Sequence, residues 1–175
     1  VLVLVYIFLF SETLEQAKKN KYALKPKIII KNYAILLTNK SFIIMCVCAG
    51  IPLAWVMSYA NIAPFLFINT LHVSPITFGW ITLIIGLGNI TGKFSNAFVI
   101  KKITLTKTIM LGMSIGLTSG VWLLLINAIH LESIYSIIIA LLFIQLGVGL
   151  IISNVPAIAL PPFKHISGSA AAIYR

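Results

Sequence analysis

The longest uncharged stretch of the chain covers residues 41–92, which contain no Asp, Glu, Lys or Arg. A transmembrane helix needs about 20 apolar residues, so this stretch is too long for one span and long enough for two. Turn-forming residues at 69–75 divide it, and Pro75 suits the first turn of a second helix. Only 9% of the whole chain is charged, whereas soluble domains carry about 25%. We therefore predict an all-α, polytopic membrane protein.

Hydrophobic runs within residues 41–163 predict four complete spans, at about residues 41–66, 76–100, 108–127 and 134–160. Residues 1–14 contain a shorter apolar run, which we interpret as the end of a truncated transmembrane helix. Residues 164–175 are predicted to form a cytoplasmic turn and the start of a further helix. We therefore expect the chain to be a piece of a longer protein.

Basic residues occur in three places: residues 18–40, residues 93–107, and Lys164 with Arg175. The connections near residues 67–75 and 127–133 contain no Lys or Arg. Four spans would place the three basic groups on one side of the membrane. Lys and Arg are retained on the cytoplasmic side, so we predict a bacterial inner-membrane protein with cytoplasmic lysines. The net charge of +10 is then explained without a nucleic-acid partner.

Residues 15–40 are predicted to be a cytoplasmic, lysine-rich central loop. Two apolar patches within it, at residues 28–30 and 34–37, are too short to span a bilayer. The simpler interpretation is a solvated loop. The alternative is a connector that lies on the anionic inner leaflet, to which its lysines would be attracted.

Small residues in the spans predict closely packed helices. Gly112, Gly116 and Gly120 recur at every fourth position and share one helix face, and Gly147 and Gly149 lie in the fourth span. Cys46 and Cys48 point about 200° apart on a helix, so neither a disulfide nor a metal site is expected from this pair. The residues predict no metal or cofactor site.

Five motifs occur in an order that resembles a known family. They are Phe10-Ser11-Glu12-Thr13-Leu14, Tyr59-x-x-x-x-Pro64-Phe65, Val73-Ser74-Pro75-x-x-Phe78-Gly79-Trp80, Gly147-x-Gly149 followed by Ala157-x-Ala159-Leu160-x-Pro162-Phe163, and Gly168-Ser169-Ala170-x-Ala172. This series is similar to the C-terminal half of the major facilitator superfamily, specifically the bicyclomycin/chloramphenicol-resistance type of drug:proton antiporter. The resemblance implies a partial major-facilitator-type helical bundle, from the end of helix six to the start of helix eleven. In that fold, two six-helix halves rock around a central cavity.

The resemblance extends to a conformational loop motif. Gly92 and Asn96, followed by Lys101 and Lys102, resemble a degenerate copy of the superfamily's glycine–acid–basic cytoplasmic motif, with Asn96 near the place of an acid.

Polar side chains are costly in hydrocarbon, so those in the spans are candidates for function. The resemblance implies that helices seven and ten line the cavity. On that basis Gln145 and Asn154 are predicted to face substrate, with Tyr59 and Asn61 opposite. The alternative is that these side chains form hydrogen bonds between helices. Four aromatic residues could stack on a planar or cationic drug: Trp55, Tyr59, Trp80 and Trp122. For Trp80, a place in the interfacial belt is the better explanation.

The resemblance implies a secondary transporter that exports hydrophobic small molecules in exchange for protons. Its partners would be the lipid bilayer and a missing N-terminal half. The four predicted spans contain no Asp or Glu, so we expect the proton-coupling groups to lie outside this chain. An inactive remnant of a broken transporter gene, or a carrier of a sugar or metabolite, is the alternative. No nucleophile with an adjacent base is evident in the spans, so we do not expect an enzyme.

Overall fold

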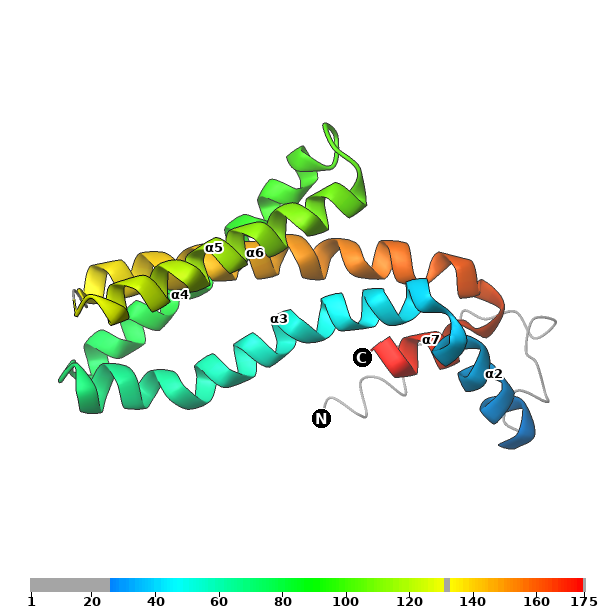
Figure 1. Ribbon diagram of the computed structural model, residues 1–175, viewed down its shortest axis with the longest axis horizontal. Coiled ribbons are helices and arrows are strands. Elements are labelled where there is room, and N and C mark those ends of the chain that lie inside the picture. The colour runs from blue at the N-terminus through cyan, green and yellow to red at the C-terminus, as the bar shows by residue number, and fades with distance from the viewer. Residues whose placement is uncertain (1–25, 131–132, 175) are drawn as a thin grey trace, which may run out of the picture.

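The computed structural model describes residues 26–130 and 133–174 (Figure 1). All the regular secondary structure in these two ranges is helical. Four helices are long and apolar enough to cross a membrane. The prediction of an all-α chain with four potential spans is confirmed to this extent. The predicted helix end in residues 1–14 lies outside the described residues.

The elements follow one another along the chain with short connections. They are α2 (Pro26–Thr38), α3 (Lys40–Pro64), the π-helix η2 (Phe65–Thr70), α4 (Pro75–Val99), α5 (Leu105–Ala128), α6 (Ile134–Ala159), the 3₁₀-helix η3 (Pro161–Ile166) and α7 (Ser167–Tyr174). The four long helices begin and end close to the predicted span limits. The main difference is that the first span continues beyond Pro64 as η2.

Residues 26–38, which lie within the predicted central loop of residues 15–40, form a helix. Pro26 is the first residue of α2, a position where its missing N–H costs nothing. No Gly or Pro interrupts the next twelve residues, and Leu36 is fully buried. The lysines in this segment suggested a loop, whereas the spacing of its apolar residues permits a helix that packs on one face.

Side-chain caps fix where three of the long helices begin. Asn39 accepts a hydrogen bond from the Phe42 N–H at 3.0 Å, and Ser74 accepts one from the Thr77 N–H at 3.2 Å. Thr104 caps α5 in the same way. Each cap satisfies a backbone donor that the first helical turn leaves free.

Helix α6 is the central element of the bundle. Buried residues make up 56% of its most apolar stretch, against 11–22% in the other three potential spans. In Figure 1, α4 and α5 cross α6, and α3 runs along its other side. Helix α3 contacts α6 towards both ends: Met45, Cys48 and Ala49 pack beside Val155 and Ala159, whereas Ala63 and Phe67 share a cluster with Ile137 and Leu141.

Glycines set the closest approach of α6 to its two neighbours. A Cβ added to Gly149 would lie 2.5 Å from the Asn89 carbonyl oxygen of α4, and one added to Gly147 would lie 2.5 Å from the Gly112 carbonyl oxygen of α5. Neither distance is possible for a real side chain. The predicted packing role is therefore seen at Gly112, Gly147 and Gly149.

The rest of the predicted glycine stripe on α5 is open. A Cβ on Gly116 or Gly120 would meet no atom within 4 Å among the described residues. The backbone nitrogen of Gly116 nevertheless lies 3.4 Å from the position of a Cβ on Gly147, so α5 and α6 are also close at this turn. The packing role of Gly116 and Gly120 stays a prediction.

Candidate functional site

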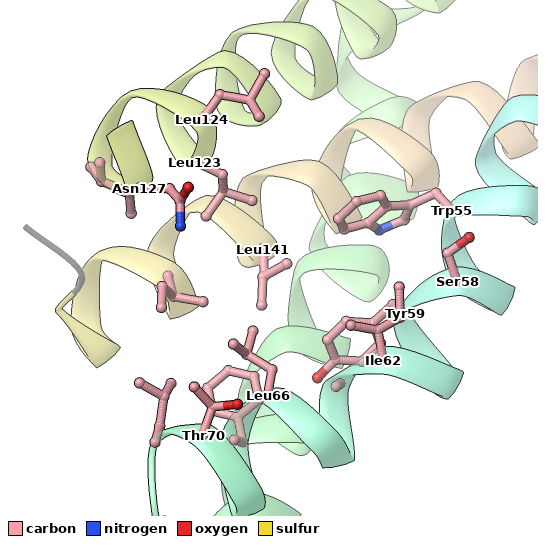
Figure 2. Close-up of a pocket in the computed structure, with 15 residues that line it drawn as sticks. Trp55, Ser58, Tyr59, Ile62, Leu66, Thr70, Leu123, Leu124, Asn127 and Leu141 are labelled. Carbon is pink, nitrogen blue, oxygen red and sulfur yellow. The ribbon is translucent and has the colours of Figure 1, made fainter. Parts of the chain in front are cut away.

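A pocket of about 460 Å³ lies between α3 with η2 on one side and α5 with α6 on the other (Figure 2). This volume falls within the range of roughly 300–1,000 Å³ that is typical of small-molecule sites. The pocket is close to the two connections without lysine, since Leu71 and Asn127 contribute to it. Its lining residues are Trp55, Ser58, Tyr59, Ile62, Ala63, Leu66, Phe67, Thr70, Leu71, Leu123, Leu124, Ile126, Asn127, Ile137 and Leu141.

One face of α3 supplies the aromatic wall. Trp55, Tyr59 and Ile62 follow one another at helical spacing, so all three point the same way. Figure 2 shows Trp55 and Tyr59 extending from α3 towards Leu141 of α6. The regular spacing of these residues is the reason that one helix can present two aromatic rings to the same cavity.

Pro64 changes the geometry of this wall. Proline has no N–H for the helical ladder, and the chain continues beyond Pro64 as the wider π-helix η2. Leu66, Phe67 and Thr70 of η2 all line the pocket. Single π-helical turns often occur at functional sites.

An apolar cluster extends from the lining of the pocket into the bundle. Phe67 is fully buried, and its ring centroid lies 5.8 Å from that of Phe78 in α4. The same cluster joins all four long helices through Ile85, Ile126 and Leu141. The aromatic wall and the opposite wall are therefore held by a common core.

The pocket is mainly apolar and contains a few hydrogen-bonding groups. The Trp55 indole N–H is buried and has no hydrogen-bond partner among the described residues. The Tyr59 hydroxyl is also buried and faces Thr82 without a well-formed hydrogen bond. A buried donor that lacks a partner costs about 1–3 kcal/mol. An acceptor on a bound ligand, or a water molecule, would remove this cost.

The predicted cavity residues occupy different places. Tyr59 lines the pocket, as described above. Asn61 is exposed, and its side chain donates a hydrogen bond of 2.7 Å to the Met57 carbonyl oxygen of its own helix. Gln145 is partly buried where α6 faces Gly88 of α4, and its Oε1 has no hydrogen-bond partner among the described residues. Whether Asn61 and Gln145 face a larger cavity stays a prediction.

Asn154 lies between helices. It is only 1% exposed and donates hydrogen bonds to Asn96 Oδ1 of α4 at 2.6 Å and to the Leu150 carbonyl oxygen at 2.7 Å. This geometry matches the alternative of an interhelical hydrogen bond. The structure thus brings together two residues that the sequence assigned to separate features, the cavity and the loop motif.

The predicted loop motif is divided between a helix and a turn. Gly92 and Asn96 both lie within α4, and only Lys101 and Lys102 lie in the connection to α5. Gly92 packs against the Leu146 carbonyl and Gly149 of α6. Asn96 and Gly92 therefore both contact α6, one through a hydrogen bond and one through close backbone packing.

Sequence reasoning missed the contribution of α5 to the pocket. Leu123 and Leu124 lie near the end of α5 and carry no motif or unusual chemistry that distinguishes them from lipid-facing residues, whereas the polar side chain of Asn127 was the one available signal. Trp80, in contrast, is 65% exposed and does not line this pocket, in keeping with a place in the interfacial belt.

The chain was compared with known protein families, with curated proteins and with solved structures, and nothing matched it. Within residues 26–130 and 133–174, no group of three or more His, Cys, Asp or Glu side chains could hold a metal ion. The candidate site is therefore defined by the pocket and its aromatic wall.

Proposed function

We propose that the chain is part of an inner-membrane secondary transporter of the major facilitator type, and that the pocket on α3 binds a hydrophobic aromatic compound. The observation that carries this proposal is the pocket itself. It combines two aromatic side chains, two buried donors and an aliphatic opposite wall within helices that are able to span a membrane. Aromatic faces bind planar rings and also attract lipophilic cations.

We infer the direction of transport from the charge distribution. If lysines mark the cytoplasmic side, the pocket lies near the opposite, outer ends of the helices. We propose that it holds substrate on its way out of the cell. The acidic groups for proton exchange would lie elsewhere in the complete protein, because the described spans contain neither Asp nor Glu.

The lining favours a drug-like compound over a sugar. A sugar needs several converging hydrogen-bonding side chains, whereas most residues around this pocket are Leu, Ile, Ala or Phe. An inactive remnant would be under no requirement to keep such a pocket able to bind a ligand. Ligand binding is therefore the property to test.

Tryptophan fluorescence provides the test because the chain has three Trp residues and only one of them lines the pocket. A protein with Trp80→Phe and Trp122→Phe keeps Trp55 as its single reporter. We expect tetraphenylphosphonium to quench this reporter saturably in lipid nanodiscs. Tyr59→Ala should weaken binding by about tenfold, the equivalent of roughly 1.4 kcal/mol for a cation–π contact.

Two matched controls make the result specific. Met57→Ala, on the same helix but outside the pocket, should leave the affinity unchanged. A protein that keeps only Trp80 reports partition of the probe into lipid, since Trp80 is exposed on the surface. Non-saturable quenching that is equal for Trp55 and Trp80 would contradict the proposal.

A further inference from the structure

Helix α2 is held against the end of the bundle by one of its faces. Leu36 is fully buried in a cluster with Phe42, Phe163 and Ala170. The rings of Phe42 and Phe163 meet edge to face, with 5.2 Å between their centroids. Since Leu36 is locked into this cluster, the rotation of α2 about its own axis is fixed.

The other faces of α2 present an apolar stripe. Ile30, Tyr33, Ala34 and Leu37 are spaced by three and four residues, which places them along one side of the helix. All four are exposed, with Ile30 at 68% and Leu37 at 58%. This stripe is separate from the face that carries Leu36, so packing within the described part of the chain leaves it uncovered.

Two lysines border the stripe. Lys27 precedes Ile30 by three residues and Lys31 precedes Ala34 by three, so each is a surface neighbour of an apolar side chain. Both lysines are exposed. An apolar stripe beside cationic side chains is typical of helices that lie in the plane of a membrane interface.

The position of α2 agrees with such a place. The helix has 13 residues, too few to span a bilayer. It precedes the Asn39 cap of α3 and turns away from the α3 axis beside α7 (Figure 1). Its stripe therefore lies beside the beginning of α3, at one end of a potential span.

The charge of the residues around α2 indicates which kind of surface the helix would bind. No Asp or Glu occurs in residues 26–130 or 133–174, so the lysines at this end have no acidic partner within those ranges. These lysines are Lys27, Lys31, Lys40 and Lys164. Anionic phospholipids would supply the missing negative charge, and they surround any protein that spans a bacterial membrane.

We infer that α2 binds the anionic lipid surface on the lysine-bearing side of the membrane. Ile30, Tyr33 and Leu37 enter the boundary between headgroups and acyl chains. Lys27 and Lys31 contact lipid phosphates. Helix α2 then anchors the first turn of α3 to the membrane surface through Leu36 and its cluster. This inference goes beyond the proposed transport function and does not depend on the pocket.

The test uses the whole chain in nanodiscs of neutral phosphatidylcholine, with or without anionic phosphatidylglycerol. Cys46→Ser and Cys48→Ser remove the native thiols, and Leu37→Cys receives an environment-sensitive dye. We expect lipids that carry a quencher near the headgroup to quench the dye, more strongly when phosphatidylglycerol is present. Lys27→Gln with Lys31→Gln should remove the dependence of quenching on phosphatidylglycerol. We expect the affinity of α2 for anionic lipid to fall about fivefold for each lysine removed. The matched control, Lys101→Gln with Lys102→Gln in the connection after α4, should leave it unchanged.

Three results would overturn the inference. Equal quenching in neutral and anionic nanodiscs would remove the role of the lysines. Full exposure of the dye to a water-soluble quencher in both nanodiscs would place the stripe in solvent. Protection of the dye from both the water-soluble quencher and the lipid-borne quencher would show that protein, not lipid, covers the stripe.

Discussion

Asn154 shows how a single polar residue can be singled out in a sequence while its partner stays undetermined. The cost of an amide in hydrocarbon marks it as unusual, and that much is available from the sequence. Its partner, Asn96, is 58 positions away and is reached only because Gly92 and Gly149 allow α4 and α6 to approach closely. The sequence contains both residues but not the distance between them.

The Asn96–Asn154 hydrogen bond should therefore contribute measurably to stability. We expect Asn154→Leu to lower the unfolding free energy by about 0.6 kcal/mol and by no more than about 1.7 kcal/mol, the range measured for such bonds in membrane proteins. Asn96→Leu should have a similar effect. The double variant should lose less than the sum, because each single variant already breaks the same bond. Unfolding of the four proteins in mixed detergent micelles measures this, and strictly additive losses would show that the two residues act separately.

Tyr59, which the sequence predicts to face substrate, lines the pocket together with Trp55 and Leu123. The aromatic residues could be listed from the sequence as possible stacking groups. Which of them share a pocket depends on the rotation of α3 and on the π-helical segment after Pro64. Neither the rotation of α3 nor the π-helical segment can be predicted from local composition.

At the scale of elements, the crossing of α4 and α6 depends on a small number of glycines. Gly88 and Gly92 of α4 pack directly on backbone atoms of α6, whereas Gly79 on the same helix has open space where a Cβ would be. Spacing alone does not separate these cases. Small residues in an apolar helix indicate close packing somewhere, and the crossing angle decides where.

Substitution of these two kinds of glycine by alanine should therefore have different effects on the stability of the bundle. Gly92→Ala should destabilise the bundle by about 1–3 kcal/mol, since the new methyl group would overlap the Leu146 carbonyl. Gly79→Ala should be neutral or stabilise by up to about 1 kcal/mol, because alanine is the better helix former and has room. Thermal denaturation in one detergent compares them. Equal effects of the two substitutions would mean that α4 does not approach α6 through Gly92.

The elements themselves were predictable to different degrees. The spans follow from long uncharged stretches, and Pro75 and the capping residues mark where helices begin. Helix α2 was not predicted, because the seven lysines in residues 15–40 indicated a loop. Its place in the fold depends on Leu36, which shares a buried cluster with Phe163, 127 positions further along the chain, and no local pattern contains that association.

At the scale of the whole molecule, the charge distribution and the helix order describe the same arrangement. Four helices that alternate in direction put the lysine-bearing connection after α4 at one side, and the connections after η2 and α5 at the other. The pocket lies at the second side and α2 at the first. The proposed transport pocket and the proposed lipid contact of α2 both require this arrangement, so the membrane topology is the most important property to test.

Cysteine accessibility in intact cells tests this topology directly. In a background with Cys46→Ser and Cys48→Ser, Ser133→Cys reports on the connection before α6, and it costs no capping bond because the Ser133 side chain makes none. Lys102→Cys reports on the connection after α4. A membrane-impermeant maleimide should label Ser133→Cys in intact cells and Lys102→Cys only after the membrane is opened. Labelling of both positions from the same side, or of Lys102→Cys alone in intact cells, would contradict the account.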